Sequence, residues 1–120
     1  MHELSIAMSL VDVACEQAES LGARVEALHV RLGPLSGVVA EALAFSFTLA
    51  CDGTRIAGAR LVIETMPIVA RCTTCSADRV LASAQHLHCP VCGDFTPDLI
   101  GGRELELFAL EVEEDVSANR

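Results

Sequence analysis

Two Cys-x2-Cys turns constrain the fold of this chain more than any other feature. One turn carries Cys72 and Cys75, and the other carries Cys89 and Cys92. Each turn directs two thiolates at one ion, so together they predict a tetrahedral four-sulfur site, for which Zn(II) is the usual occupant. The segment has few large apolar side chains, and in small zinc modules the metal supplies about 10–16 kcal/mol of folding free energy. We therefore expect a zinc-binding module over residues 71–98, ordered by ligation.

A four-sulfur cage has no open coordination position, which favours a structural role over hydrolytic chemistry. Two alternatives remain for these cysteines: iron in the cage, as in rubredoxin-like electron carriers, and a zinc-ribbon adaptor that transports no metal. A ribbon that binds nucleic acid would show a basic face bearing aromatic residues. Residues 71–98 instead hold two cations and three carboxylates, which are Arg71, Arg79, Asp78, Asp94 and Asp98.

Two histidines, His86 and His88, shortly precede Cys89. One interpretation makes them additional ligands or proton sensors near the cage. The other makes them exposed residues of a loop, which is the commoner situation for histidines in such a position.

The charge balance is acidic, with 8 Lys+Arg against 17 Asp+Glu and a formal net charge of −9. Such a field repels a phosphate backbone, so we expect no nucleic-acid partner. The start of the chain lacks the pattern of a signal peptide, and no apolar stretch is long enough to span a bilayer. We expect a cytoplasmic protein without a membrane partner, in which reduced thiols favour metal binding over disulfides.

Two segments have the periodicity of helices. Apolar residues recur at helical spacing over residues 4–21, and Gly22 follows as a C-cap. A second, mostly apolar helix is predicted over residues 38–51. Cys15 and Cys51 lie on the apolar faces of these helices, so we interpret both as core residues.

Three further segments, residues 24–32, 59–70 and 103–112, have the composition and alternation of strands. Pro67 interrupts the second and predicts a bulge, an edge position or a break there. His29 falls on the polar face of the first, which predicts a solvated side chain. The order of elements predicts an α+β fold, in which two helices pack on one face of a small, mostly antiparallel sheet. The four-cysteine, zinc-ribbon-like module is inserted before the last strand.

The chain begins Met1-His2-Glu3, which places an imidazole one residue from the α-amine. The amine, the amide nitrogen of His2 and the imidazole can together chelate one metal ion. A nitrogen-rich, square-planar set of this kind suits Ni(II) or Cu(II). Taken alone, the same residues are also compatible with a frayed, solvated terminus.

The combination of motifs resembles a known family. It joins Met1-His2-Glu3-Leu4-Ser5 at the terminus, Arg31-Leu32-Gly33 at the end of a strand, and paired Cys-x2-Cys turns before a final strand. These features together resemble the HypA/HybF family of nickel metallochaperones, which serve the maturation of [NiFe] hydrogenase. The resemblance covers essentially the whole chain.

The resemblance implies a carrier that binds Ni(II) through His2 and the Met1 amino terminus, with Glu3 in support. It implies that Cys72, Cys75, Cys89 and Cys92 are structural Zn(II) ligands. The partners it implies are a HypB-type nickel GTPase, the [NiFe] hydrogenase large subunit and urease maturation factors. Some relatives use an acidic residue as an added nickel ligand, and Glu41 stands near the corresponding stretch.

These assignments define a domain organisation. Residues 1–70 plus 99–113 form the nickel-binding α+β domain, residues 71–98 form the zinc-binding module, and residues 114–120 form a flexible tail. No nucleophile–base pair, phosphate-cradling glycine loop or open metal site is visible, so we expect a protein that is not an enzyme.

Overall fold

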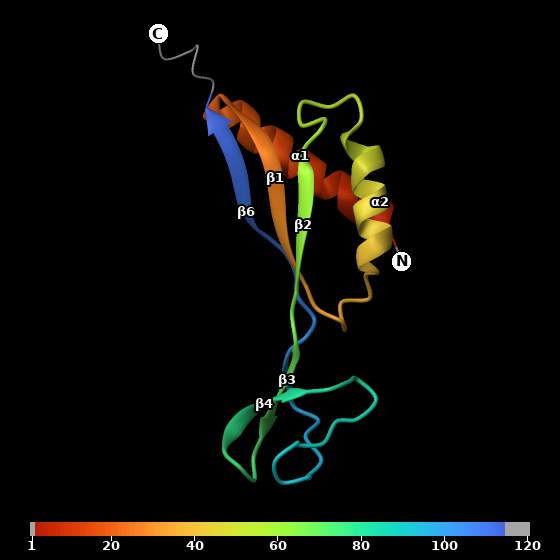
Figure 1. Ribbon diagram of the computed structural model, residues 1–120, viewed down its shortest axis with the longest axis vertical. Helices are drawn as coiled ribbons and strands as arrows, with labels where there is room; N and C mark the ends of the chain where they lie inside the picture. Colours follow the sequence, from red (N-terminus) through yellow and green to blue (C-terminus); the bar gives the residue numbers. More distant parts are fainter. Residues whose placement is uncertain (1, 115–120) are drawn as a thin grey trace. The chain divides into compact units, whose positions relative to one another are not determined.

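The computed structural model describes residues 2–114 (Figure 1). Met1 and most of the predicted tail, residues 114–120, therefore lie outside the described residues. Three strands form one sheet in the order β2-β1-β6, and three form another in the order β4-β3-β5. The elements in chain order are α1 (Glu3–Leu21), β1 (Ala23–Leu32), α2 (Ala40–Cys51), β2 (Arg60–Thr65), β3 (Ile68–Cys72), β4 (Ala77–Leu81), β5 (Leu99–Gly101) and β6 (Leu105–Glu114).

Helix α1 confirms the helix predicted over residues 4–21. It ends at Gly22, which adopts a left-handed conformation with φ 62° and donates its amide to the carbonyl of Ala18. One stripe of the helix is fully covered, and it consists of Ala7, Val11, Ala14 and Ala18. Small residues on this stripe allow the helix to lie close to its neighbours.

Helix α2 begins at Ala40, two residues later than predicted. The preceding Val39 is extended, with φ −88° and ψ 119°, so it acts as the N-cap rather than as a helical residue. Leu43 and Phe47 are buried in the core that α2 shares with α1. Cys51 is 4% exposed in this core and Cys15 packs against it, in agreement with the interpretation of both as core residues.

The β2-β1-β6 sheet carries the helices on one face, as Figure 1 shows. Side chains of β1, β2 and β6 join those of the helices in one apolar cluster, which includes Val25, Leu28, Leu61 and Leu107. Strands β1 and β2 run in the same direction, with α2 as the crossover between them (Figure 1).

Strand β6 is antiparallel to β1. Arg24 of β1 contacts Glu113 of β6, and His29 of β1 contacts Glu111 of β6. Residue numbers therefore increase along β1 in the direction in which they decrease along β6. The second sheet is antiparallel at both of its strand pairs. The α+β class with mostly antiparallel sheets is therefore confirmed.

The run predicted over residues 59–70 divides into β2 and β3, which belong to different sheets, and Pro67 stands at the division, so the break that it predicted is confirmed. Two other details of the strands differ from the sequence expectation. Strand β4, inside the cysteine segment, and strand β5, which follows that segment, were not expected. In β1 the alternation slips, because Ala27 and Leu28 are both buried.

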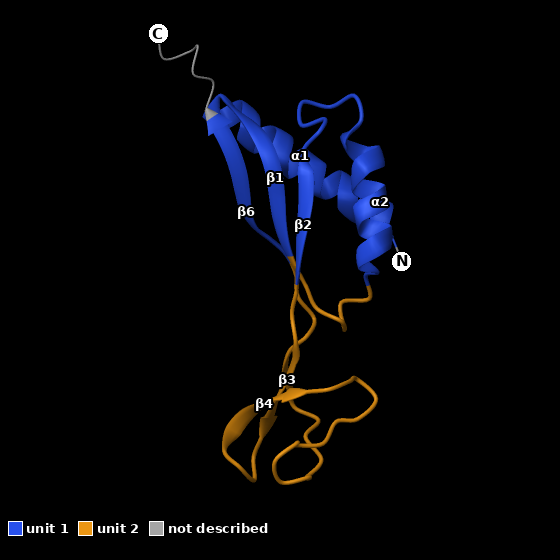
Figure 2. Ribbon diagram, viewed as in Figure 1, with its two compact units in different colours: residues 1–30, 38–64, 106–120 blue, residues 31–37, 65–105 orange. Residues whose placement is uncertain are grey.

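The chain divides into two compact units, coloured in Figure 2. Unit 1 comprises residues 1–30, 38–64 and 106–120, and unit 2 comprises residues 31–37 and 65–105. The core of unit 2 is small, and its hydrophobic cluster has three buried members, Ile68, Ala70 and Leu81. The functional domain limits given by the sequence stay a prediction. Across residues 2–114, the structure contains no helix with the length and apolar character of a membrane span.

Candidate metal centre

The four cysteines of the two turns converge in unit 2. Cys72 ends β3 and Cys75 lies in the turn to β4, while Cys89 and Cys92 lie in the loop before β5. Their four sulfur atoms all lie within 4.8 Å of one another. The Cys72 and Cys92 sulfurs are 3.5 Å apart, and those of Cys75 and Cys89 are 3.9 Å apart.

This geometry fits a single tetrahedral ion. Zn–S bonds of about 2.3 Å in a tetrahedral site place neighbouring sulfurs about 3.8 Å apart. Cys72 is 0% exposed and Cys89 is 2% exposed, so two of the ligands are shielded from solvent. The donor set and the two closest sulfur–sulfur distances are therefore compatible with Zn(II) ligation.

Backbone amides around the second turn point at sulfur. Val91 and Cys92 both donate to the sulfur of Cys89, at 3.4 Å each. The Cys92 amide is the largest cause that lowers the pKa of the Cys89 thiol, to about 6. Gly93, with φ 80°, donates its amide to the Cys89 carbonyl at 2.8 Å and so closes the turn.

The thiol of Cys92 shifts the other way. The Asp94 amide lowers its pKa, but desolvation and the three neighbouring cysteines outweigh that effect and raise the pKa to about 12. Four sulfurs this close cannot all ionise without a cation, because each thiolate opposes the next. A divalent ion removes the conflict, since it binds all four as thiolates.

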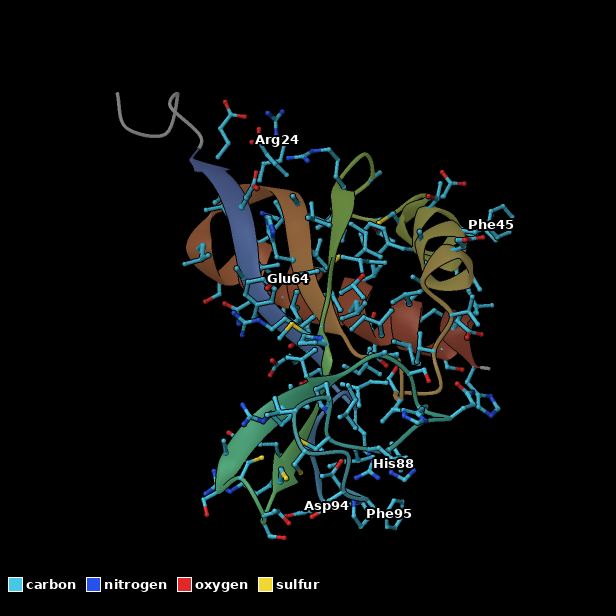
Figure 3. All side chains as sticks on the ribbon, turned by 60° about the horizontal axis from the view of Figure 1, so that its bottom comes forward. Arg24, Phe45, Glu64, His88, Asp94 and Phe95 are labelled. Atoms are coloured by element: carbon cyan, nitrogen blue, oxygen red, sulfur yellow. The ribbon has the colours of Figure 1, made fainter. Side chains whose placement is uncertain are left out.

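Polar contacts join the two turns. The Thr74 hydroxyl donates to the carboxylate of Asp94, which links the first turn to the loop that follows the second. His88, Asp94 and Phe95 lie at this end of unit 2 (Figure 3), where the His88 and Phe95 rings are 5.7 Å apart.

His86 and His88 do not enter the four-sulfur cluster, which is the only metal-type grouping among residues 2–114. Their rings are 4.7 Å apart, and Nδ1 of His88 lies 3.3 Å from the carbonyl oxygen of Gly93. Their roles as additional ligands or proton sensors, or as exposed loop residues, stay predictions.

The other predicted site lies at the start of α1. His2 is exposed and adopts a left-handed conformation with φ 56°, where histidine is one of the more frequent non-glycine residues. Its carbonyl accepts the first helical hydrogen bond, from the amide of Ile6 at 3.1 Å. The imidazole makes no capping hydrogen bond to the helix. Met1, which would supply the amine, lies outside the described residues.

Glu3 has a structural contact that the sequence did not reveal. Its Oε2 accepts a hydrogen bond of 3.1 Å from the backbone amide of Val39, the N-cap of α2. The first turns of the two helices are thereby tied together. Glu41 lies in the first turn of α2, at the same end of the helix as Val39.

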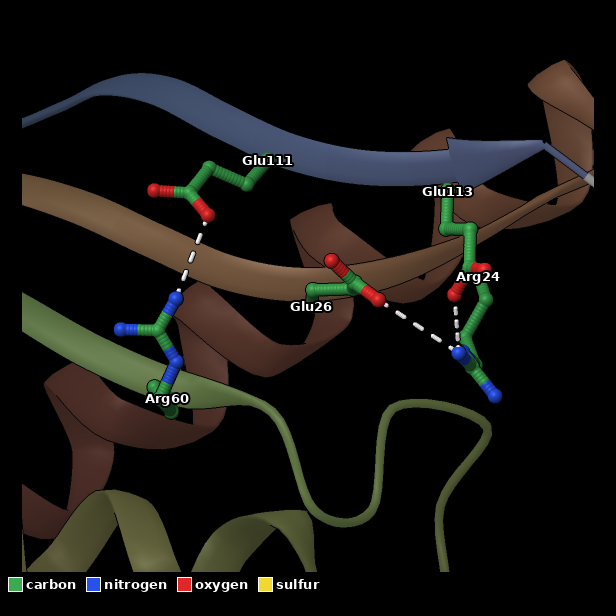
Figure 4. A network of polar contacts seen from close by, with 5 residues as sticks. All are labelled: Arg24, Glu26, Arg60, Glu111 and Glu113. Atoms are coloured by element: carbon green, nitrogen blue, oxygen red, sulfur yellow. Dashed lines mark hydrogen bonds and ion pairs between the residues drawn. The ribbon is translucent and has the colours of Figure 1, made fainter.

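A network of ion pairs joins side chains of strands β1, β2 and β6 in unit 1 (Figure 4). Arg24 pairs with Glu26 and Glu113, and Arg60 pairs with Glu111. The negative charge of Glu113 is the main cause that raises the pKa of Arg24. These side chains are largely solvated, so the pairs add little to stability.

His29 belongs to this group, contrary to the expectation of a solvated side chain. Its Nε2 lies 2.7 Å from Oε1 of Glu111, and its ring packs edge-on against Phe108 with centroids 6.0 Å apart. The side chain is 24% exposed. The contact arises from β6, which the local sequence around His29 does not reveal.

Over residues 2–114, the fold and the sulfur cluster define a small α+β protein with a preformed four-thiol cage that can hold a metal ion. The sequence profile described as "HypA: Hydrogenase/urease nickel incorporation, metallochaperone, hypA" matches residues 1–112. The chain therefore belongs to the HypA family of metallochaperones for nickel incorporation. The resemblance noted in the sequence is confirmed.

Individual relatives agree with this placement. "Hydrogenase maturation factor HypA" of Roseiflexus sp. (strain RS-1) is 50% identical over 116 residues, which cover 96% of this chain and 94% of the relative. The protein of the same name from Chloroflexus aurantiacus (strain ATCC 29366 / DSM 635 / J-10-fl) is 47% identical over 112 residues, covering 92% of this chain and 98% of its own.

The solved structures support the fold. The solution structure of the Ni metallochaperone HypA from Helicobacter pylori matches with a TM-score of 0.64 at 23% identity, covering 96% of this chain and 100% of that chain. A second solution structure, of HypA protein, matches with a TM-score of 0.70 at 23% identity, covering 96% of this chain and 98% of that chain.

Proposed function

We propose that this chain binds Ni(II) at its N-terminus and delivers it for hydrogenase maturation, while Zn(II) in the four-cysteine cage maintains the fold of unit 2. The observation that carries the proposal is the family match over residues 1–112, which includes the Met-His-Glu terminus and both cysteine turns. The nickel ligands are His2, the Met1 amine and the nearby amides, with Glu3 in support. Zinc is held by Cys72, Cys75, Cys89 and Cys92.

The two metals have different requirements, and the two sites differ accordingly. A cargo site must release its ion, and His2 is exposed at the end of the chain, where ligands can detach one at a time. A structural site must retain its ion, and the cysteine cage has four converging ligands and no open position. Copper binds such a terminus more tightly than nickel by its intrinsic preference, so nickel supply and partner docking provide the selectivity.

The partners follow from the same proposal. A HypB-type nickel GTPase exchanges nickel with this chain, and the [NiFe] hydrogenase large subunit receives it. The description of the family also includes urease, so urease maturation factors are included as partners. In this role the protein acts in the cytoplasm as a carrier, not as an enzyme, and binds neither nucleic acid nor membrane.

The terminal site is tested by blocking the α-amine. Isothermal titration of Ni(II) into tag-free, zinc-loaded protein should show one terminal site. One residue added before Met1 turns the amine into an amide, and should weaken nickel binding by at least tenfold. His2→Ala should have a comparable effect, because it removes the imidazole ligand.

The matched control for His2→Ala is His29→Ala. His29 is held by Glu111 on the sheet of unit 1, so its loss should leave nickel affinity unchanged. Zinc content and circular dichroism should be those of the native protein in all three variants. Unchanged nickel affinity in the extended protein would refute the terminal site.

Glu3 serves both the proposed nickel site and the fold, and two substitutions separate these roles. Glu3→Ala removes the acceptor of the Val39 amide and should lower the free energy of unfolding by about 1 kcal/mol. Glu3→Gln keeps a side-chain oxygen for that amide, so it should retain most of the stability while losing the carboxylate. Urea unfolding measures the first effect, and nickel titration of Glu3→Gln measures any contribution of the carboxylate. Equal stability of Glu3→Ala and the native protein would show that the hydrogen bond between Glu3 and the Val39 amide does not stabilise the fold.

The same preparation separates the alternative functions. A rubredoxin-like iron centre would give a red protein with visible absorption, whereas zinc gives a colourless one. An adaptor without a transported metal would show stoichiometric zinc and no second site in the nickel titration. Elemental analysis together with the titration therefore distinguishes the carrier from both.

A further inference from the structure

Two histidines of unit 2 lie together in the loop before the second cysteine turn. The ring centroids of His86 and His88 are 4.7 Å apart, with an angle of 43° between the ring planes. Both residues are exposed, and they line a surface cavity of about 340 Å³ together with Leu81, Ala82 and Cys89. Two imidazoles that face one cavity can offer nitrogen ligands to a single occupant.

The hydrogen bond of His88 determines which of its ring nitrogens is available. Its Nδ1 lies 3.3 Å from the carbonyl oxygen of Gly93. A carbonyl oxygen only accepts, so Nδ1 carries the hydrogen and, in the neutral imidazole, the lone pair is on Nε2. Histidines that bind metals usually have this arrangement, in which the other ring nitrogen donates to a carbonyl or a carboxylate. His88 can therefore bind an ion through Nε2 without a change of tautomer.

The position of His88 is held by contacts on the other strand of its loop. The backbones of His88 and Phe95 form an antiparallel bridge, and the Phe95 ring lies 5.7 Å from the His88 ring (Figure 3). The amide of Thr96, which is 2% exposed, donates to the carbonyl of Leu87 at 2.7 Å. An ion that binds here orders little more than the side chain of His86, so the entropic cost of binding is small.

The separation of the two rings agrees with the binding of one ion by both. A metal–nitrogen bond of about 2.1 Å places the ion about 3.2 Å from each ring centroid. Two imidazoles bound side by side, at angles of about 90–109°, then have centroids about 4.5–5.2 Å apart. The observed 4.7 Å between His86 and His88 lies in this range.

The ligands and the cavity wall define the class of ion. Among the described residues that line the cavity, none has a carboxylate, an ammonium or a guanidinium group. Mg²⁺ and Ca²⁺ require oxygen ligands, whereas imidazole suits Ni(II), Cu(II) and Zn(II). Two protein ligands leave the remaining positions to water. An ion held here is therefore exchangeable, unlike one in the closed four-sulfur cage.

We propose that His86 and His88 form a second transition-metal site, open to solvent, which binds a late first-row divalent ion such as Ni(II) through both imidazoles. The site is distinct from the terminal chelate at His2 and from the four sulfurs, and it does not depend on the terminal chelate. Its two ligands are fewer than those of the terminal chelate, so its nickel affinity should be the lower of the two.

The test first removes the terminal site and then each histidine of the pair. Tag-free, zinc-loaded His2→Ala protein is titrated with Ni(II) alone and followed by amide NMR. Nickel with water in its remaining positions is paramagnetic, so the signals of residues 86–89 and 93–95 should broaden. Adding His86→Ala or His88→Ala should weaken this binding by about tenfold or more, because a single imidazole cannot chelate.

His29→Ala, added to His2→Ala, is the matched control. Nε2 of His29 lies 2.7 Å from Oε1 of Glu111, so this imidazole is already engaged, and its loss should leave the nickel affinity of His2→Ala unchanged. Elemental analysis should find the same zinc content in every variant before and after nickel is added.

The outcomes separate this inference from the proposed function. If native protein binds nickel and His2→Ala binds none, the histidine pair is not a site and the terminal site stands. Nickel binding in His2→Ala that displaces zinc, or that survives the loss of either imidazole, would also reject the pair. If native and His2→Ala proteins bind nickel equally and both broaden at residues 86–89, the terminal site is wrong and the pair stands.

Discussion

Cys72→Ser should abolish the zinc binding proposed for the cage and unfold unit 2 while unit 1 stays folded. Cys72 is 0% exposed at the end of β3, so the serine hydroxyl would replace one of four sulfur ligands inside a covered site. Structural zinc contributes about 10–16 kcal/mol to the folding of small modules. The buried core of unit 2 consists of Ile68, Ala70 and Leu81, which is too small to replace that contribution. Elemental analysis should show loss of the bound zinc.

Amide hydrogen exchange shows where the structure is lost. In Cys72→Ser the amides of β3 and β4 should exchange rapidly, because their pairing depends on the cage. The amides of α1 and β1 should stay protected, since they belong to the core of unit 1. A chelator that strips zinc from the native protein should reproduce the same pattern.

Cys15→Ser is the matched control. Cys15 lies against the core of unit 1 and outside the sulfur cluster, so the same chemical change there should leave the zinc content unaltered. A Cys72→Ser protein that kept one zinc per chain and protected β3 amides would show that the fourth sulfur is not needed. The zinc assignment would then have to be revised.

The helices and the cage could be predicted because their signals are local. Helical periodicity and a terminal glycine specify α1, and the spacing of the cysteines in each turn aims both sulfurs at one point. Pro67 likewise marked the place where one apolar run becomes two strands. In each case the residues that define the feature lie close together in the chain.

Features that depend on distant partners were missed. Strand β4 has only alternate residues covered, and its place is fixed by pairing with β3 and by the cage beside it. The contact of His29 with Glu111 needs the register of β6, and the contact of Glu3 with Val39 needs the packing of two helices.

Gly33→Ala should destabilise unit 2 by about 3 kcal/mol or more, at or above the upper end of the usual cost of adding a methyl group where there is no room. A Cβ at Gly33 would lie 2.2 Å from the carbonyl oxygen of Gly102 and 2.3 Å from its carbonyl carbon. Both are backbone atoms, so no side-chain rotation relieves the clash.

The surrounding hydrogen bonds make the clash more severe. The Gly33 amide donates to the Glu104 carbonyl at 2.8 Å, and the Leu35 amide donates to the Gly102 carbonyl at 2.7 Å. The two segments of unit 2 are therefore held at a fixed separation that leaves no room for a methyl group. Moving them apart would break both bonds and leave their groups unpaired.

Gly22→Ala separates this steric effect from backbone strain. Gly22 has φ 62°, and a Cβ at this position would meet no atom within 4 Å, so alanine there costs only the left-handed conformation, about 1–2 kcal/mol. Urea unfolding followed by residue-resolved NMR should place the larger loss in unit 2 for Gly33→Ala and the smaller loss in unit 1 for Gly22→Ala. If Gly33→Ala were as stable as the native protein, the prediction would be wrong. Residues 33–35 and 102–104 would then be able to separate without a loss of stability, despite the two hydrogen bonds between them.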